Sequence, residues 1–160
     1  MTEPSVPRKR PQAEGHAAKW LPAMIRLTAV GYLFFFVPDL ILATTHHVQD
    51  LPPYLARLFN WGEGGDAVAV MFATVYIVWA IFLFGSARAP LTHRLFLDLN
   101  LCANSAHFGA MAIMALAMPE HHEHTVGVLV LGALTIVPVG ACWLPVRRIA
   151  TTMLATPTPF

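Results

Sequence analysis

The hydrophobic positions of this chain fall into four long stretches, separated by shorter polar segments. They cover residues 21–45, 67–87, 95–118 and 126–144, so each has 19 to 25 residues. A helix of roughly 20 residues crosses the hydrocarbon core of a bilayer. The stretches lack the alternation of barrel strands, and a backbone in lipid must satisfy its own hydrogen bonds. The pattern therefore predicts an all-α fold, a four-helix transmembrane bundle.

The segments between and beyond these stretches define the rest of the organisation. Residues 1–20 contain several prolines around a basic cluster, which predicts a disordered tail before a membrane domain at 21–146; residues 147–160 form a second tail. In the first long connection, Leu51, Tyr54, Leu55, Leu58 and Phe59 recur with helical spacing, which predicts a short amphipathic helix. The later connections are short, so the second and third helices, and the third and fourth, are expected to pack antiparallel.

The composition agrees with a membrane protein and excludes other classes. Hydrophobic residues make up 56% of the chain and charged residues 12%, about half the usual charged share of a soluble domain. No basic face interleaved with aromatic residues is present, so nucleic acid is not expected as a partner.

The distribution of lysine and arginine predicts the orientation. Of the 10 cationic residues, nine lie in the tails, near the start of the first stretch or in the connection at 88–94, and only Arg57 lies on the other side. Cytoplasmic loops carry such an excess. We therefore expect an inner (plasma) membrane protein with both termini in the cytoplasm and with the loops 46–66 and 119–125 outside.

The third stretch carries a polar stripe. Its residues follow each other in steps of three and four, which places them on one helix face: Asn100, Asn104, His107, Met111, Met114 and Met118. Polar groups in a bilayer normally face the protein interior. One interpretation is that they bond to other helices while the methionines fill space. The other is a polar cavity around His107 for a small molecule, a quinone or a metal; haem would lack a second histidine, because the other three stretches contain none.

Histidines gather in both loops expected outside. They are His46 and His47 in the first loop and His121, His122 and His124 in the second. If the first and third helices pack side by side, these groups converge, and imidazole is a ligand for zinc or copper. Alternatively, these histidines are solvated residues at the ends of helices.

Two carboxylates lie inside the apolar stretches. Asp98, near the start of the third stretch, is expected to pair with Arg26 or Arg94, and Asp39, near the end of the first, with a histidine of the outer loops. Neither has the neighbouring carboxylate that acid–base catalysis by a carboxylate pair requires.

The segment 87–94 (Ala-Arg-Ala-Pro-Leu-Thr-His-Arg), followed by Asp98, Asn104 and His107 and by the histidine-rich loop before Gly127, resembles small bacterial four-helix inner-membrane proteins of the DoxX-like kind. The resemblance implies the four-span architecture and no particular active site.

The leading functional hypothesis is a non-enzymatic membrane protein, either an accessory subunit of a larger membrane complex or a small-ligand binder, with homo-oligomerisation as a way to cover the polar stripe. The alternatives are zinc or copper binding or transport through the histidine-rich loop and the methionines, and a redox or quinone-linked membrane subunit centred on His107.

Overall fold

The structure, a computed structural model, describes residues 12–59 and 65–155 and is helical throughout, with no strand among these residues. The long helices are α1 (Gln12–Thr44), α3 (Gly65–Ser86), α4 (Arg94–Ala117) and α5 (Thr125–Ala155), and the short ones are α2 (Pro53–Phe59), η1 (Val48–Asp50), η2 (Pro90–Thr92) and η3 (Pro119–His124). The predicted all-α class with four long apolar helices is confirmed.

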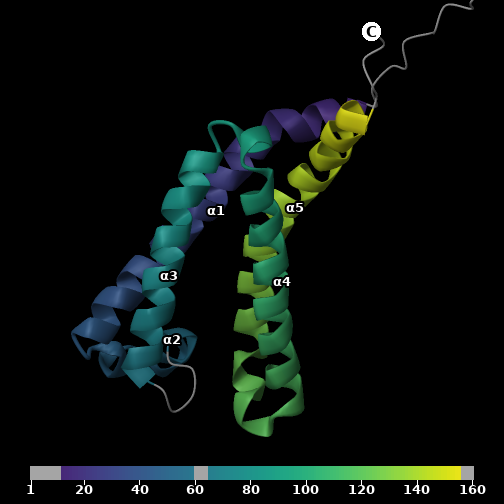
Figure 1. Ribbon diagram of the computed structural model, residues 1–160. Helices are drawn as coiled ribbons and strands as arrows, with labels where there is room; N and C mark the ends of the chain where they lie inside the picture. Colours follow the sequence, from purple (N-terminus) through teal and green to yellow (C-terminus); the bar gives the residue numbers. More distant parts are fainter. Residues whose placement is uncertain (1–11, 60–64, 156–160) are drawn as a thin grey trace, which may run out of the picture.

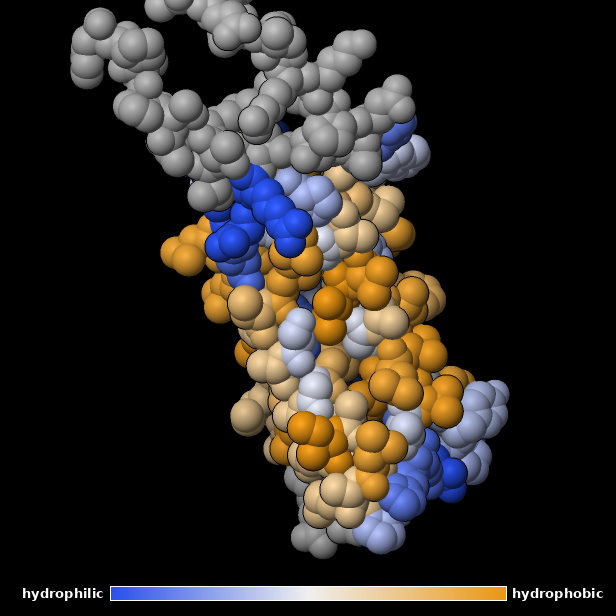
Figure 2. Space-filling model, turned by 90° about the vertical axis from the view of Figure 1, so that its right-hand side faces the viewer, coloured by the Kyte–Doolittle hydropathy of each residue, from blue (hydrophilic) through white to orange (hydrophobic). Residues whose placement is uncertain are grey.

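Four of the helical segments are long and apolar enough to cross a membrane: Gly15–Thr44, Gly65–Ser86, Arg94–Ala117 and His121–Arg148. Large apolar side chains are exposed along all of them, among them Phe34, Ile81, Leu95 and Leu129. The surface in Figure 2 accordingly has an apolar middle with hydrophilic residues toward both ends. This is the surface of a multi-pass membrane protein.

The first and last long helices, α1 and α5, extend beyond the apolar stretches into the segments that were predicted as tails. α1 begins at Gln12 rather than near residue 21, and α5 continues past residue 146 to Ala155. The segment 12–20 consists mostly of Gln, Ala, Glu and Lys, which favour a helix in spite of their polarity. Residues 12–20 of the predicted first tail are therefore helical and belong to α1, and residues 147–155 of the second belong to α5. Residues 1–11 and 156–160 lie outside the described residues.

The four long helices form two pairs, α1 with α3 and α4 with α5, joined by a further contact between α1 and α5 (Figure 1). The start of α1 and the end of α5 lie together at one end of the bundle, the tail end. The other end carries η1, α2 and η3 and is called the loop end. Figure 1 shows the two pairs meeting toward the tail end and diverging toward the loop end.

The antiparallel neighbours predicted from the short connections are only partly found. α4 and α5 form a close pair, whereas the α3 and α4 backbones stay apart in spite of their short connection. Small residues explain the close pairs: Ala69, Ala73 and Ala80 are buried on one face of α3, and Gly132 of α5 lies against Phe108 of α4. Large aromatic residues of α3, described below, lie between α3 and α4.

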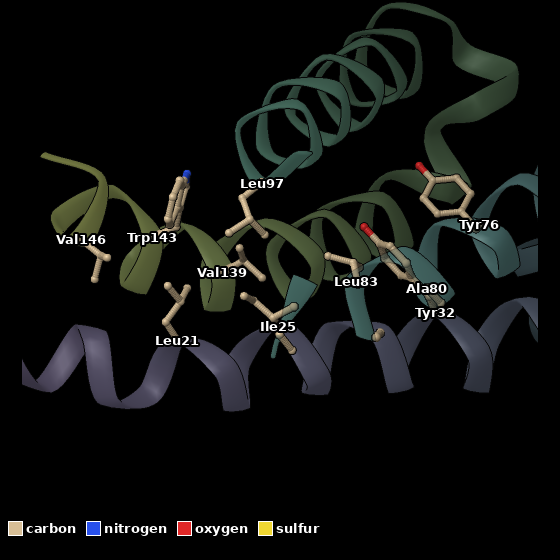
Figure 3. Close-up of a cluster of buried hydrophobic side chains, with 12 residues drawn as sticks. Leu21, Ile25, Tyr32, Tyr76, Ala80, Leu83, Leu97, Val139, Trp143 and Val146 are labelled. Carbon is tan, nitrogen blue, oxygen red and sulfur yellow. The ribbon is translucent and has the colours of Figure 1, made fainter. Parts of the chain in front are cut away.

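The tail end is closed by a cluster of buried side chains to which all four long helices contribute (Figure 3). Leu21 and Ile25 of α1 lie opposite Val139 and Trp143 of α5, and Leu97 of α4 completes the contact. These side chains are at most 2% exposed. The cluster thus holds the two helix pairs together at this end.

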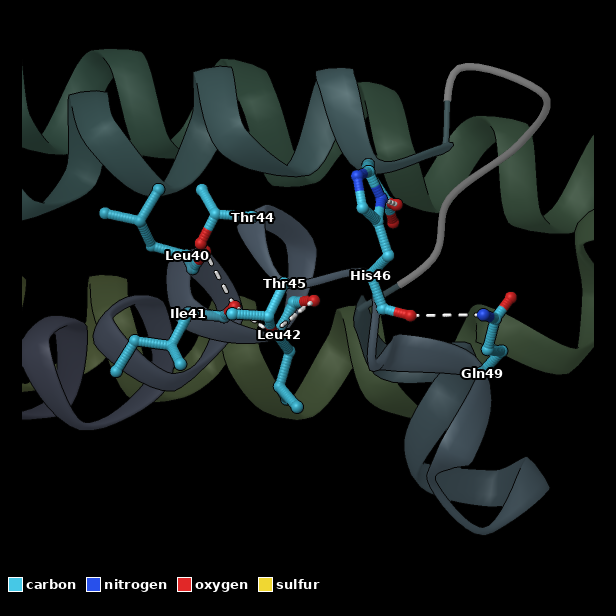
Figure 4. A network of polar contacts seen from close by, with 8 residues as sticks. Leu40, Ile41, Leu42, Thr44, Thr45, His46 and Gln49 are labelled. Carbon is cyan, nitrogen blue, oxygen red and sulfur yellow. Dashed lines mark hydrogen bonds and ion pairs between the residues drawn. The ribbon is translucent and has the colours of Figure 1, made fainter.

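At the loop end, α1 ends in a polar turn (Figure 4). The hydroxyls of Thr44 and Thr45 bond back to carbonyls of the last helical turn, at 2.7 Å each to Leu40 and Ile41. His46 then adopts a left-handed conformation with φ 58°. Its Nδ1 lies 2.6 Å from Asp66 Oδ2, so the turn is tied to the first turn of α3.

Candidate ligand-binding cavity

A cavity of about 800 Å³ is lined by residues of both helix pairs. α1, α3, α4 and α5 all contribute to its wall, and Phe59 of α2 and Gly65 border it at the loop end. Some lining side chains, such as Phe34 (82% exposed), also lie on the molecular surface, so the cavity opens toward the lipid-facing side. Its volume lies within the range of pockets for drug-sized ligands.

The α1 wall carries three buried polar atoms that have no hydrogen-bond partner among the described residues. They are Thr28 Oγ1, Tyr32 OH and Asp39 Oδ1, and their residues are at most 4% exposed. The Tyr32 hydroxyl lies near Asn104, but the geometry falls short of a hydrogen bond. Steps of four and seven residues place the three side chains on one helix face. Buried polar groups in proteins nearly always have a hydrogen-bond partner, so a partner for these three atoms is missing among the described residues.

Rings surround the same wall and form a continuous chain across three helices. Phe35 stacks on Phe59 of α2 with centroids 5.0 Å apart, and Phe36 stacks on Tyr76 of α3 at 4.3 Å. Tyr32 meets Tyr76 edge to face at 5.1 Å. All five residues line the cavity. A ligand there would meet rings on α1, α2 and α3.

The two asparagines of the polar stripe bond to aromatic residues of α3. The Asn100 side-chain oxygen accepts from Trp79 Nε1 at 3.0 Å, and the Asn104 oxygen accepts from the Tyr76 hydroxyl at 3.3 Å. The Asn104 amide also donates to the Asn100 carbonyl at 2.7 Å. Both asparagines are buried, and they are the polar link between α3 and α4.

His107 lies on the wall between this cavity and a smaller one of about 260 Å³, which Met71, Val75 and Trp79 also line. The imidazole is half-buried among rings, with centroids 5.4 Å from Phe72 and 5.2 Å from Phe108. Its place at mid-height of α4 fits an interaction with a ligand in either cavity.

The methionines of the stripe lie at different places. Met111 and Met114 line the large cavity, whereas Met118 follows the end of α4 and is exposed. Of the six stripe residues, His107, Met111 and Met114 thus line the large cavity. Sequence reasoning missed Thr28 and Tyr32 on the opposite wall, although their spacing to Asp39 was a signal.

The histidines at the loop end do not gather at one point. His46 pairs with Asp66, and His47 Nδ1 lies 2.6 Å from Asp50 Oδ2. His122 Nε2 lies 3.2 Å from the Leu116 carbonyl oxygen. Among the described residues, no three His, Cys, Asp or Glu side chains are grouped closely enough to hold a metal ion. α1 and α4, whose contact was the condition for convergence, do not form a close pair.

The second histidine-bearing loop is nevertheless linked to α2. Glu123 of η3 lies 3.0 Å from Arg57 of α2 and 3.8 Å from His124. Because α2 follows α1 and η3 follows α4, the Arg57–Glu123 ion pair joins the two halves of the molecule where the helix pairs diverge.

Both carboxylates inside the helices have environments that differ from the predictions. Asp98 pairs with neither Arg26 nor Arg94 but with α5: Arg147 Nε lies 2.8 and 2.9 Å from its two oxygens, and Trp143 Nε1 donates to it at 2.9 Å. Asp39 was expected to pair with a histidine, but its buried oxygen has no partner. His46 and His47 instead pair with Asp66 and Asp50.

Comparisons of the chain with protein-family models, with curated proteins and with solved structures found no match. The resemblance to DoxX-like proteins therefore stays a prediction.

Proposed function

We propose that this chain is a small-ligand binding protein of the inner membrane, which holds a lipophilic molecule in the cavity between its helix pairs. The tail end faces the cytoplasm in this proposal, because nine of the 10 lysines and arginines fall on that side. Neither proton transfer nor covalent chemistry is part of it.

The proposal is carried by the three unpartnered polar atoms on the α1 wall. A buried polar group without a partner costs about 1–3 kcal/mol, so three in one cavity wall are a substantial combined cost. A bound molecule with a few polar groups would remove that cost. The remaining lining is mainly apolar and aromatic, which is the usual composition of a small-molecule site.

The test is to identify what the full-length protein retains on purification. The chain is reconstituted in lipid nanodiscs, and bound small molecules are extracted and quantified per chain by mass spectrometry. We expect one non-bulk-lipid molecule per chain. A quinone in the extract would support the redox hypothesis about His107 within the same proposal.

A pair of glycine variants provides the control. Gly31 lines the cavity and Gly109 lies on the exposed surface of α4 outside it; a Cβ would meet no atom within 4 Å at either position. Gly31→Trp should fill the cavity and abolish retention, while Gly109→Trp should retain the wild-type level. Equal retention by both variants, or a wild-type extract with bulk lipid alone, would overturn the proposal. A stable dimer with an empty cavity would do so too.

A further inference from the structure

We infer that the ligand is a lipophilic organic cation, whose charge pairs with Asp39 while its apolar body lies among the aromatic rings of the cavity. This inference rests on the proposed function and adds the chemical class of the ligand.

The charges of the cavity wall are the first argument. Among the described residues that line the cavity, Asp39 is the one carboxylate, none is a lysine or arginine, and His107 is the other titratable side chain apart from the tyrosines. Asp39 is 4% exposed, and one of its oxygens has no hydrogen-bond partner. A charged carboxylate in such surroundings is costly unless it is paired with an opposite charge. No described residue of the lining supplies a lysine or arginine charge, so a cationic ligand would complete the pair.

The same wall disfavours anionic ligands. A fatty acid or a phosphate ester would bring a second negative charge beside Asp39, and the described part of the lining has no guanidinium or ammonium group to offset it. Two like charges in a poorly hydrated site repel each other strongly. The ammonium group of a phospholipid offers the same chemistry as a free amine, but it brings a phosphate with it, and the lining favours the free amine.

The rings around Asp39 are the second argument. Phe35 and Phe36 precede Asp39 by one helical turn, which places them beside it on α1. Through their stacking on Phe59 and Tyr76, the rings extend from Asp39 to α2 and α3. Aromatic faces attract organic cations, and rings combined with a carboxylate form a recurrent site for them.

The loop end adds a third argument, which concerns access. Among the described side chains of the loop end are one arginine, Arg57, and three acids, Asp50, Asp66 and Glu123. A surface with an excess of negative charge raises the local concentration of cations. The cavity borders this end through Phe59 and Gly65, so a cation would be attracted toward its entrance.

The experiment compares two probes of nearly the same shape and opposite charge, tetraphenylphosphonium and tetraphenylborate. Their binding to the full chain in nanodiscs of neutral lipid is measured by equilibrium dialysis, with empty nanodiscs subtracted. We expect the wild type to bind the cation and not the anion. Asp39→Asn should weaken cation binding at least about tenfold, as the loss of a close charge pair does.

Two further variants separate the roles of charge and fold. Asp39→Glu keeps the charge and should restore cation binding. Asp50→Asn removes an exposed acid of the loop end, which is 67% exposed on its side chain, and should change affinity by less than about threefold. If Asp39→Glu fails to bind while remaining folded, the placement of the charge is wrong and the inference is overturned.

The outcomes distinguish this inference from the proposed function. Equal binding of both probes, or unchanged cation binding in Asp39→Asn, overturns the ligand class but leaves the cavity as a binding site, provided that Gly31→Trp still loses its extracted molecule. If Gly31→Trp alters neither the extract nor probe binding, the proposed function itself fails. Displacement of the bound probe by nanodiscs that contain phosphatidylethanolamine, but not by a free lipophilic amine, would identify a headgroup as the source and overturn the free-amine choice.

Discussion

Replacing Gly132 by alanine tests how closely α4 and α5 are packed. A Cβ at this position would lie 3.1 Å from both Cβ and Cγ of Phe108 and 3.3 Å from its Cδ1. These atoms lie near the α4 backbone, so rotation of the Phe108 ring cannot relieve the contact. Phe108 and the α4 backbone that carries it must therefore shift slightly away from α5.

The size of the effect follows from two opposing terms. Overpacking of a well-packed contact costs about 1–3 kcal/mol, whereas the exchange of glycine for alanine within a helix stabilises by about 0.5–1 kcal/mol. Gly140, also on α5, isolates the first term. Its nearest atom to an added Cβ is Leu101 Cδ2 at 3.6 Å, an ordinary van der Waals contact. In the difference between Gly132→Ala and Gly140→Ala the helix term cancels, so Gly132→Ala should be less stable by about 1–3 kcal/mol.

The assay is reversible unfolding of the purified chain in mixed micelles, followed by tryptophan fluorescence and by circular dichroism. Both alanine variants and the wild type are measured under the same conditions. If Gly132→Ala were as stable as Gly140→Ala, or more stable, the close approach of α4 and α5 at this position would be wrong.

Three further outcomes are expected in the same unfolding assay. Asp98→Asn should lower the free energy of unfolding by about 1–2 kcal/mol, because the contact with Arg147 is a charge-assisted hydrogen bond of a half-exposed pair; an unchanged stability would argue against that contact. Arg57 and Glu123 should show a coupling energy below about 1 kcal/mol in a double-mutant cycle, since both are well exposed, and a larger coupling would indicate that the loop end is more enclosed. Tyr76→Phe should cost about 0.6 kcal/mol, the usual worth of an interhelical hydrogen bond in a membrane; a gain in stability would contradict the bond.

The sequence by itself determined the number and type of the helices. Apolar stretches of bilayer length leave the backbone no alternative to a helix in lipid. The helices therefore begin and end within a few residues of the predicted bounds, except where residues 12–20 and 145–155 extend them. The local pattern of α4 was equally readable: spacing alone indicated that Asn100, Asn104 and His107 share a face. Information of this kind is local, because helical periodicity relates residues within one or two turns.

The tertiary structure decided which helices lie next to each other and therefore which residues line the cavity. Whether two helices pack closely depends on the sizes of facing side chains, such as Ala73 on α3 or Gly132 on α5, and one helix does not show which residues will face it. The short connection between α3 and α4 suggested a close pair, but the rings of α3 hold the backbones apart. A charged side chain can pair only with a group that the fold places within a few ångströms of it. Asp98 therefore pairs with Arg147 on α5, whereas the buried oxygen of Asp39 has no partner among the described residues.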